Sequence, residues 1–82
     1  MKKVSDEIEF EDPEKLSAIY DYFSSHGFYC RAGPGIQCYF DNHKLIGYVE
    51  RRPNQNTSII SLFKKSERFE ETKKGLTGVV GN

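Results

Sequence analysis

Four side chains in this sequence are of the types that hold a zinc ion: His26, Cys30, Cys38 and His43. Their spacing, H-x3-C-x7-C-x4-H, is not among the common zinc patterns. If the stretch between them is a hairpin, both histidines lie beyond its open end, about 13 Å or more from the cysteines at ~3.3 Å per residue. Zinc ligands lie within about 2.3 Å of the metal. We therefore predict no metal site and no cofactor.

The hairpin is predicted from residues 28–40, FYCRAGPGIQCYF, which read Phe, Tyr, Cys from either end. Glycine on both sides of Pro34 suits a turn, because glycine adopts positive φ freely and proline presets its own φ. A turn centred on Pro34 places Cys30 directly opposite Cys38, with β-carbons about 4.5–5.5 Å apart. We expect two reduced thiols that fill the core; a disulfide formed on oxidation is the alternative.

Side-chain alternation divides the predicted hairpin between two faces. The core face carries Phe28, Cys30, Ile36, Cys38 and Phe40. The other face is aromatic and basic, and on it we predict the partner-binding residues Tyr29, Arg31, Gln37, Tyr39 and Tyr48, with Ile46 as the alternative to Tyr48. Tyrosine and arginine are enriched at interface hot spots, and both also stack on bases or hold phosphates. Whether a closing helix covers this face is left open.

Candidates for catalysis are few in this sequence. The turn at 33–35 lacks the strand-to-helix context of a nucleotide loop, and no serine-histidine-aspartate order or paired-carboxylate motif stands out. His43, with Asp41 nearby, is the best acid–base candidate, whereas both cysteines point toward the predicted core. We predict that the protein is not an enzyme.

A basic surface is the second candidate site, formed by Arg51, Arg52, Lys64, Lys65 and Arg68. Residues 1–26 hold three lysines against seven acids, and the remainder holds nine basic residues against five acids. The formal net charge is zero, which argues against a dedicated nucleic-acid binder.

The first part of the chain is predicted to be a strand followed by a helix. Residues 4–10 alternate as a strand with an acidic solvent face, formed by Glu7, Glu9 and Glu11. The helix is expected over 13–26, capped by Asp12, started by Pro13 and ended by Gly27. Its buried face would be formed by Leu16, Ile19, Tyr20 and Phe23.

The strand predicted over 45–52 has a register that depends on the length of the turn before it. A two-residue loop would place Leu45 and Val49 on the same face as Phe40. A three-residue loop would instead place Ile46 and Tyr48 on the same face as Phe40. Both registers are compatible with the pattern of residue types.

The remaining elements are a strand over 57–63 and a short helix over 66–76 with Gly75 as its stop. Residues 76–82 are expected to fray, and the alternative is that Val79 and Val80 dock onto the sheet. Together the elements predict one α+β domain, residues 1–82. We expect a two-layer sandwich in which an antiparallel sheet of three to five strands, in the order β-α-β-β-β-(β)-α, has its helices on one face. No apolar run approaches the ~18 residues of a membrane helix, and the N-terminus lacks the apolar centre of a secretory signal, so we expect a cytoplasmic protein without a membrane partner.

From Leu16 onward, the order helix, Gly27-Phe28, three strands and helix resembles in outline the double-stranded-RNA-binding fold, and to a smaller extent the HicA-type toxin nucleases. Gly27-Phe28 is similar to the entry of those nucleases into their first strand. Where they carry a catalytic histidine, this chain has Ile36, Gln37 and Cys38. Lys64 and Lys65 are similar to the lysine-rich start of the last RNA-binding helix, but acids follow them. No functional residue is carried over.

These features predict a small non-enzymatic binding protein that acts by occupying a protein partner. An inhibitor, immunity or adaptor factor, of the kind that small mobile-element genes encode, would fit the neutral charge and the aromatic surface. The alternative is a nucleic-acid-binding module that uses the basic surface. The oligomeric state is not indicated by the sequence.

Overall fold

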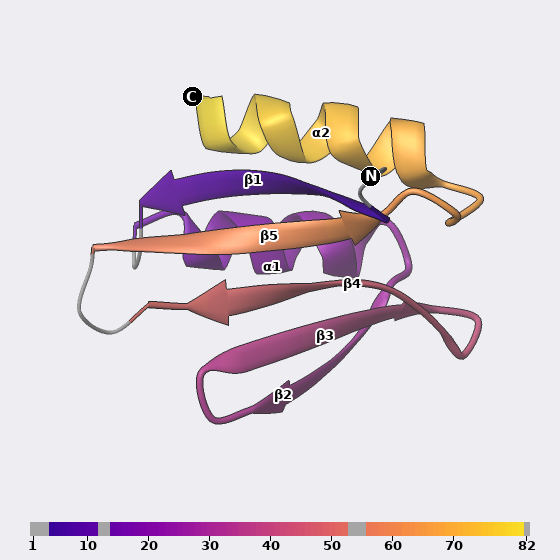
Figure 1. The fold of residues 1–82 in the computed structure, drawn as a ribbon, viewed down its shortest axis with the longest axis horizontal. Coiled ribbons are helices and arrows are strands. Elements are labelled where there is room, and N and C mark those ends of the chain that lie inside the picture. The colour runs from indigo at the N-terminus through magenta and orange to yellow at the C-terminus, as the bar shows by residue number, and fades with distance from the viewer. Residues whose placement is uncertain (1–3, 12–13, 53–55, 82) are drawn as a thin grey trace.

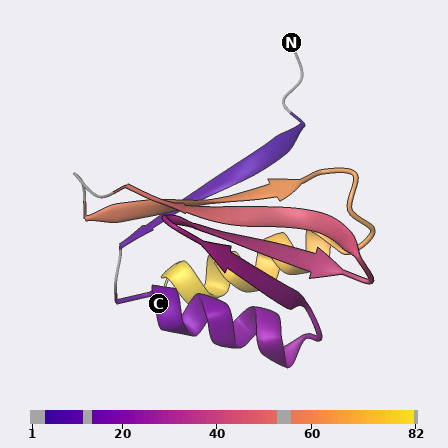
Figure 2. The ribbon, with the colours of Figure 1, turned by 90° about the horizontal axis from the view of Figure 1, so that it is seen from below.

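Two helices cover one face of a five-stranded antiparallel sheet in the computed structural model, which describes residues 4–11, 14–52 and 56–81 (Figure 1). The elements are β1 Ser5–Glu11, α1 Leu16–Ser25, β2 Tyr29–Gly33, β3 Ile36–Asp41, β4 Lys44–Arg51, β5 Thr57–Phe63 and α2 Phe69–Gly81. The strand order across the sheet is β1-β5-β4-β3-β2, so β1 and β2 are its edges. Figure 2 shows both helices on the same side of the sheet. The predicted α+β sandwich is confirmed.

The hydrophobic core lies between the helices and the sheet. At its centre the ring of Phe23 from α1 stacks on the ring of Tyr39 from β3, with 3.7 Å between the centroids. Around this pair lie the other buried apolar side chains: Phe10, Ile19, Phe28, Ile46, Val49, Ile60, Leu62 and Leu76. No helix among the described residues has the length and apolar character needed to cross a membrane.

The end of α1 has the glycine stop that the sequence predicts. Gly27 has a φ of +82°, and its N–H donates to the carbonyl of Ser24 at 3.2 Å. The N–H of Phe28 donates to the carbonyl of Phe23 at 3.0 Å, and the two rings are in edge contact. This is the Schellman arrangement, which satisfies the last carbonyls of the helix and turns the chain into β2. The cap predicted at 12–13 lies outside the described residues.

One position of the predicted buried face of α1 is wrong. Tyr20 is 47% exposed, whereas Tyr22 packs against the core. The ring of Tyr22 faces α2 at Gly75, where a Cβ would collide with it. Contact with α2 decides which tyrosine is covered, and the hydrophobic pattern of α1 alone does not predict that contact.

The β2–β3 hairpin turns over two residues, Pro34 and Gly35, and is not centred on Pro34. Gly35 has a φ of +70°, and proline followed by a glycine at positive φ is the combination that a type II turn favours. Gly33 therefore pairs with Ile36, one residue away from the predicted register.

This one-residue difference inverts the predicted faces of β3, because side chains alternate along a strand. Cys30 lies opposite Tyr39, and Arg31 lies opposite Cys38. The faces predicted for β2 are correct. On β3, Gln37 and Tyr39 face the helices, and the side chains predicted as core face the other way: Ile36, Cys38 and Phe40.

The β3–β4 connection is a two-residue loop followed by a bulge. Asn42 and His43 have φ of 50° and 70°, as a type I′ hairpin turn requires. Phe40 pairs with Leu45, but Tyr39 pairs with Gly47, so Ile46 is an extra residue on β4. The bulge combines parts of both predicted registers: Leu45 lies on the face of Phe40, as the two-residue loop predicts, and so does Tyr48, as the three-residue loop predicts.

After the bulge, β4 continues with Tyr48 opposite Cys38 and Val49 opposite Gln37. Val49 is fully buried on the helix side, so Tyr48 lies on the face that also carries Phe40. A Cβ on Gly47 would collide with the carbonyl oxygen of Ser61, which makes glycine necessary where β4 passes β5.

The closing helix is longer than predicted. α2 spans Phe69–Gly81, and the segment predicted to fray is helical over 76–81. Gly75 lies inside this helix, where the absence of a side chain leaves space for the ring of Tyr22. Val79 and Val80 pack against the core. These tertiary contacts offset the low helix propensity of glycine.

We expect Gly75→Ala and Gly78→Ala to change stability in opposite directions. A Cβ at Gly78 would meet nothing within 4 Å, so alanine there should raise the free energy of unfolding by about 0.5–1 kcal/mol. Alanine at Gly75 must displace Tyr22 and should lower it by about 1 kcal/mol. Urea unfolding of both variants measures the difference. An equal gain from both would show that Gly75 has no packing role.

Candidate functional site

The candidate site is the face of the sheet turned away from both helices, which we call the open face (Figure 2). Its residues follow from the pairing of the five strands. The apolar centre of the open face is formed by Tyr29, Ile36, Phe40, Leu45, Tyr48, Ile59 and Phe63.

Two aromatic pairs lie on the open face, each across neighbouring strands. Tyr29 and Phe40 have ring centroids 6.4 Å apart, and Tyr48 and Phe63 have centroids 6.0 Å apart. Tyr29 is 64% exposed, and Leu45 is 42% exposed. Apolar side chains that adjoin one another on an uncovered surface are typical of interaction sites.

The structure brings together three of the five predicted partner-binding residues. Tyr29, Arg31 and Tyr48 lie on the open face. Tyr39 and Gln37 do not: Tyr39 is 1% exposed, and its hydroxyl donates to Oε1 of Gln37 at 3.1 Å. The prediction that Tyr29 and Tyr39 lie side by side on one face is therefore wrong, since Tyr29 pairs with Phe40.

Burial of Tyr39 also has an electrostatic consequence. Removal of the phenol from water, followed by the influence of the nearby Cys30, raises the pKa of Tyr39 far above its ordinary value of 10.0. The neutral hydroxyl is thus a hydrogen-bond donor in the core. The sequence signal that was missed is the two-residue Pro34-Gly35 loop, which assigns Phe40 rather than Tyr39 to the surface.

The two cysteines lie on opposite faces of the sheet and are both free thiols. Cys30 packs against the core, and Cys38 lies on the open face opposite Arg31. The predicted opposition of the two thiols is wrong, and with it the possibility of a disulfide between them in this fold. In the parts of the chain that the structure describes, no group of three or more His, Cys, Asp or Glu side chains is placed to hold a metal ion.

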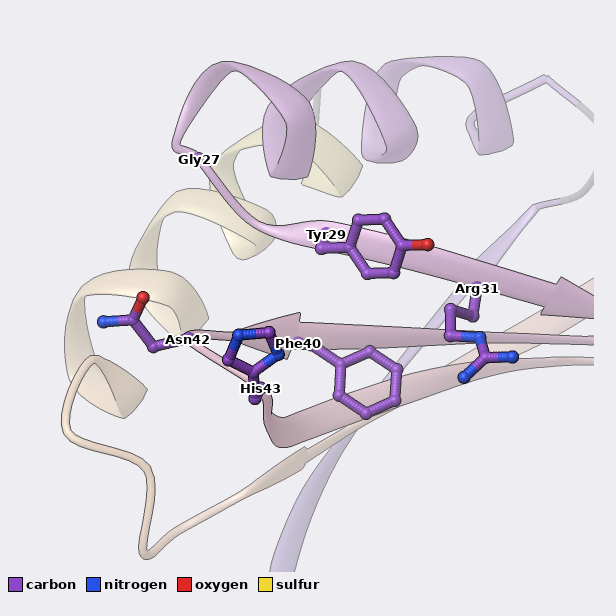
Figure 3. Close-up of a pocket in the computed structure, with 6 residues that line it drawn as sticks. All are labelled: Gly27, Tyr29, Arg31, Phe40, Asn42 and His43. Atoms are coloured by element: carbon purple, nitrogen blue, oxygen red, sulfur yellow. The ribbon is translucent and has the colours of Figure 1, made fainter.

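A groove lies at the β2 end of the open face, lined by Gly27, Tyr29, Arg31, Phe40, Asn42 and His43 (Figure 3). In Figure 3 the ring of Phe40 lies between the imidazole of His43 and the guanidinium of Arg31, with the ring of Tyr29 beside them. We call it the aromatic-basic groove. Among the residues that the structure describes, none that lines the groove is acidic, and Arg31 makes no ion pair.

The opposite margin of the open face is acidic. Along β1, the side chains of Glu7, Glu9 and Glu11 lie on the open face. They alternate with residues whose side chains face the helices, as the sequence predicts. Nη1 of Arg52 lies 3.9 Å from Oε2 of Glu9. An apolar centre between an acidic margin and a basic groove is the charge pattern of this face, with one further carboxylate, Glu50, paired with Ile36 and Ile59.

The predicted basic surface does not form one patch. Arg51 and Arg52 lie at the end of β4, whereas Lys64 and Lys65 follow the end of β5. The two strands are antiparallel, so the two groups are separated by the length of β5, roughly 20 Å for its 7 residues. The five residues therefore do not form one compact site.

Arg68, the fifth predicted basic residue, joins three elements of the fold. Its guanidinium donates to the carbonyl of His26 at 3.0 Å, pairs with Glu71 at 2.9 Å and lies 4.3 Å from the ring centroid of Phe28. The guanidinium thereby caps the end of α1. Hydrogen bonding to Glu71 raises the pKa of Arg68.

Asp6 connects the sheet edge to the lysines near it. Its carboxylate accepts a hydrogen bond from Nζ of Lys73 at 2.8 Å and lies 3.5 Å from Nζ of Lys64. The hydrogen bond from Lys73, together with both positive charges, lowers the pKa of Asp6 below its ordinary value of 3.8. Lys64 is therefore part of a structural ion-pair group.

No protein-family model, curated protein or solved structure gives a significant match. The candidate site therefore stands on the chemistry and arrangement of its own residues.

We expect Tyr39→Ala and Tyr29→Ala to differ strongly in stability. Loss of the buried ring of Tyr39, with its stacking on Phe23, should cost about 3–5 kcal/mol. Loss of the exposed ring of Tyr29 should cost about 0.5 kcal/mol or less. Thermal and urea unfolding measure both. Similar values for the two variants would contradict the register of β3.

We expect Asp6→Asn to flatten the acid side of the stability profile. Because the folded state lowers the pKa of Asp6, its ion pairs stabilise the fold above the unfolded value of 3.8, and this contribution is lost as the pH falls through the folded pKa. Urea unfolding between pH 7 and pH 2 measures it. The effect of Asp6→Asn should shrink in a Lys73→Met background. An undiminished effect there would show that Lys73 is not the partner.

Proposed function

We propose that this chain is a small non-catalytic binding protein that acts by occupying a protein partner through the open face of its sheet. The observation that carries the proposal is the aromatic and aliphatic centre of the open face, which lies on the side of the sheet away from α1 and α2 (Figure 2). An inhibitor, immunity or adaptor role fits such a protein, because in each of these roles the protein acts by covering a surface of another protein.

The composition of the open face supports a protein partner. Interface centres are apolar and rich in aromatic side chains, whereas their rims are polar. On this face Tyr48 and Phe63 lie in the middle, the carboxylates of β1 lie on one margin, and Arg31 lies near the other. Tyrosine and phenylalanine have only two side-chain torsions, so ordering their rings on binding costs little conformational entropy.

The nucleic-acid alternative has less support. Its basic residues fall at two separate ends of the sheet, and Lys64 and Arg68 are both engaged in ion pairs with carboxylates. A nucleic-acid binder depends on many phosphate contacts, and its affinity falls steeply with salt. Retention on heparin at low salt, lost on raising the salt, is the result that would favour this alternative.

We expect Tyr48→Glu to lose the partner and Tyr20→Glu to keep it. Tyr48 lies in the centre of the open face, so a buried carboxylate there should weaken binding by at least about tenfold. Tyr20 is an exposed tyrosine on α1, on the helix side of the molecule, and provides a matched control. Affinity capture from nuclease-treated extract of the source cells, followed by titration of the purified partner, measures the effect.

Both variants must show the thermal unfolding transition of the parent chain before they are compared. Equal capture by both variants would contradict a role for the open face. Loss of capture after nuclease treatment of the parent extract would identify a nucleic acid as the ligand.

A further inference from the structure

The outer edge of β2 is an unpaired strand edge. β2 is the last strand of the sheet order, and no strand of the described chain lies beyond it (Figure 1). Its residues are exposed except for Cys30, which is half-buried. Such an edge is a template for the pairing of another strand.

The two-residue turn determines which backbone groups of β2 point outward. Gly33 and Ile36 flank the loop as a hydrogen-bonded pair, so Arg31 and Tyr29 also direct their N–H and C=O groups to β3. The N–H and C=O groups of Cys30 and Ala32 then point away from the sheet. Phe28 has the same parity, and its N–H bonds to the end of α1 rather than to β3.

The two edges of the sheet differ in charge. β1 carries the carboxylates of Glu7, Glu9 and Glu11, which repel an acidic strand. On β2 the charged side chain is Arg31, which makes no ion pair within the described residues and points to the open face beside Tyr29. The β2 edge is therefore complementary to an acidic strand.

We propose that the edge of β2 binds an extended acidic segment of the partner protein as an added strand. Its backbone pairs with Cys30 and Ala32, one carboxylate pairs with the guanidinium of Arg31, and an apolar side chain two residues away lies against Tyr29. This inference rests on the proposed function and names the part of the partner that this edge recognises.

The aromatic-basic groove extends the same recognition onto the open face. Tyr29 and Phe40 offer ring surface to an apolar side chain, and His43 lies at the other side of Phe40 from Arg31 (Figure 3). A Cβ at Gly27 would meet nothing within 4 Å, so the groove is open at this point. An alternating row of N–H and C=O groups matches a peptide backbone, which has both donors and acceptors, better than a phosphate chain, which has acceptors only.

A random twelve-residue peptide library displayed on phage tests the proposal. Selection against the intact chain should enrich peptides in which acidic residues alternate with apolar or aromatic ones. Synthetic copies of the enriched peptides should bind the Arg31→Glu variant at least about tenfold more weakly. They should bind Lys65→Glu, which has the same change of charge after the end of β5, as they bind the parent chain.

Amide hydrogen exchange on the peptide complex tests the mode of binding. Strand addition should slow the exchange of the amides of Cys30 and Ala32, while that of Arg31, already bonded to β3, should change little. The proposal would be overturned if the selection enriched basic peptides, or if the selected peptides bound the Arg31→Glu variant as well as the parent chain. It would also be overturned if the peptide slowed amide exchange only in another element. Light scattering that shows concentration-dependent self-association, lost in Arg31→Glu, would assign the edge to a second copy instead and would also overturn it.

Failure of this inference can be told apart from failure of the proposed function. If capture of the whole partner is lost in Tyr48→Glu but unchanged in Arg31→Glu, the open face binds the partner and the β2 edge does not. If both variants capture the partner as the parent does, the proposed function itself fails.

Discussion

The stacking of Tyr39 on Phe23 is the contact on which both faces of the sheet depend. The two rings lie 3.7 Å apart between centroids and 15° from parallel, and both are buried. A ring that β3 turns toward α1 obliges Cys38 and Phe40 to face the other way. Since paired residues share a face, β2 and β4 must match this choice, and the composition of the open face follows from it.

Two backbone features make this arrangement possible. The Pro34-Gly35 loop closes the first hairpin in the register that buries Tyr39. The bulge at Ile46 then shifts β4 by one residue. If the pairing of Phe40 with Leu45 continued without the bulge, Tyr48 would lie opposite Gln37 and would face the helices. The inserted residue moves the ring of Tyr48 to the open face, beside Phe63.

The features that could be predicted from sequence are those set by neighbouring residues. The Gly27 stop, the alternation of β1 and the α+β order all depend on residues within one turn or one strand. The errors have a different origin. Gly75 was expected to end a helix because glycine is a poor helix former, but Tyr22 comes from another helix and makes the absence of a side chain favourable. Tyr22 is covered and Tyr20 is exposed for the same reason, because the covering contact comes from another helix.

The sequence by itself therefore determined the elements of this protein, their order and the faces of β1 and β2. Their hydrophobic periods and turn residues act locally, and no distant contact opposes them. Only the tertiary structure decided which aromatic rings of β3 and β4 are exposed, because side chains alternate with a period of two and a one-residue change of register exchanges the faces. The stacking of Tyr39 on Phe23, a contact between two elements that no local pattern contains, stabilises the register that the Pro34-Gly35 loop closes.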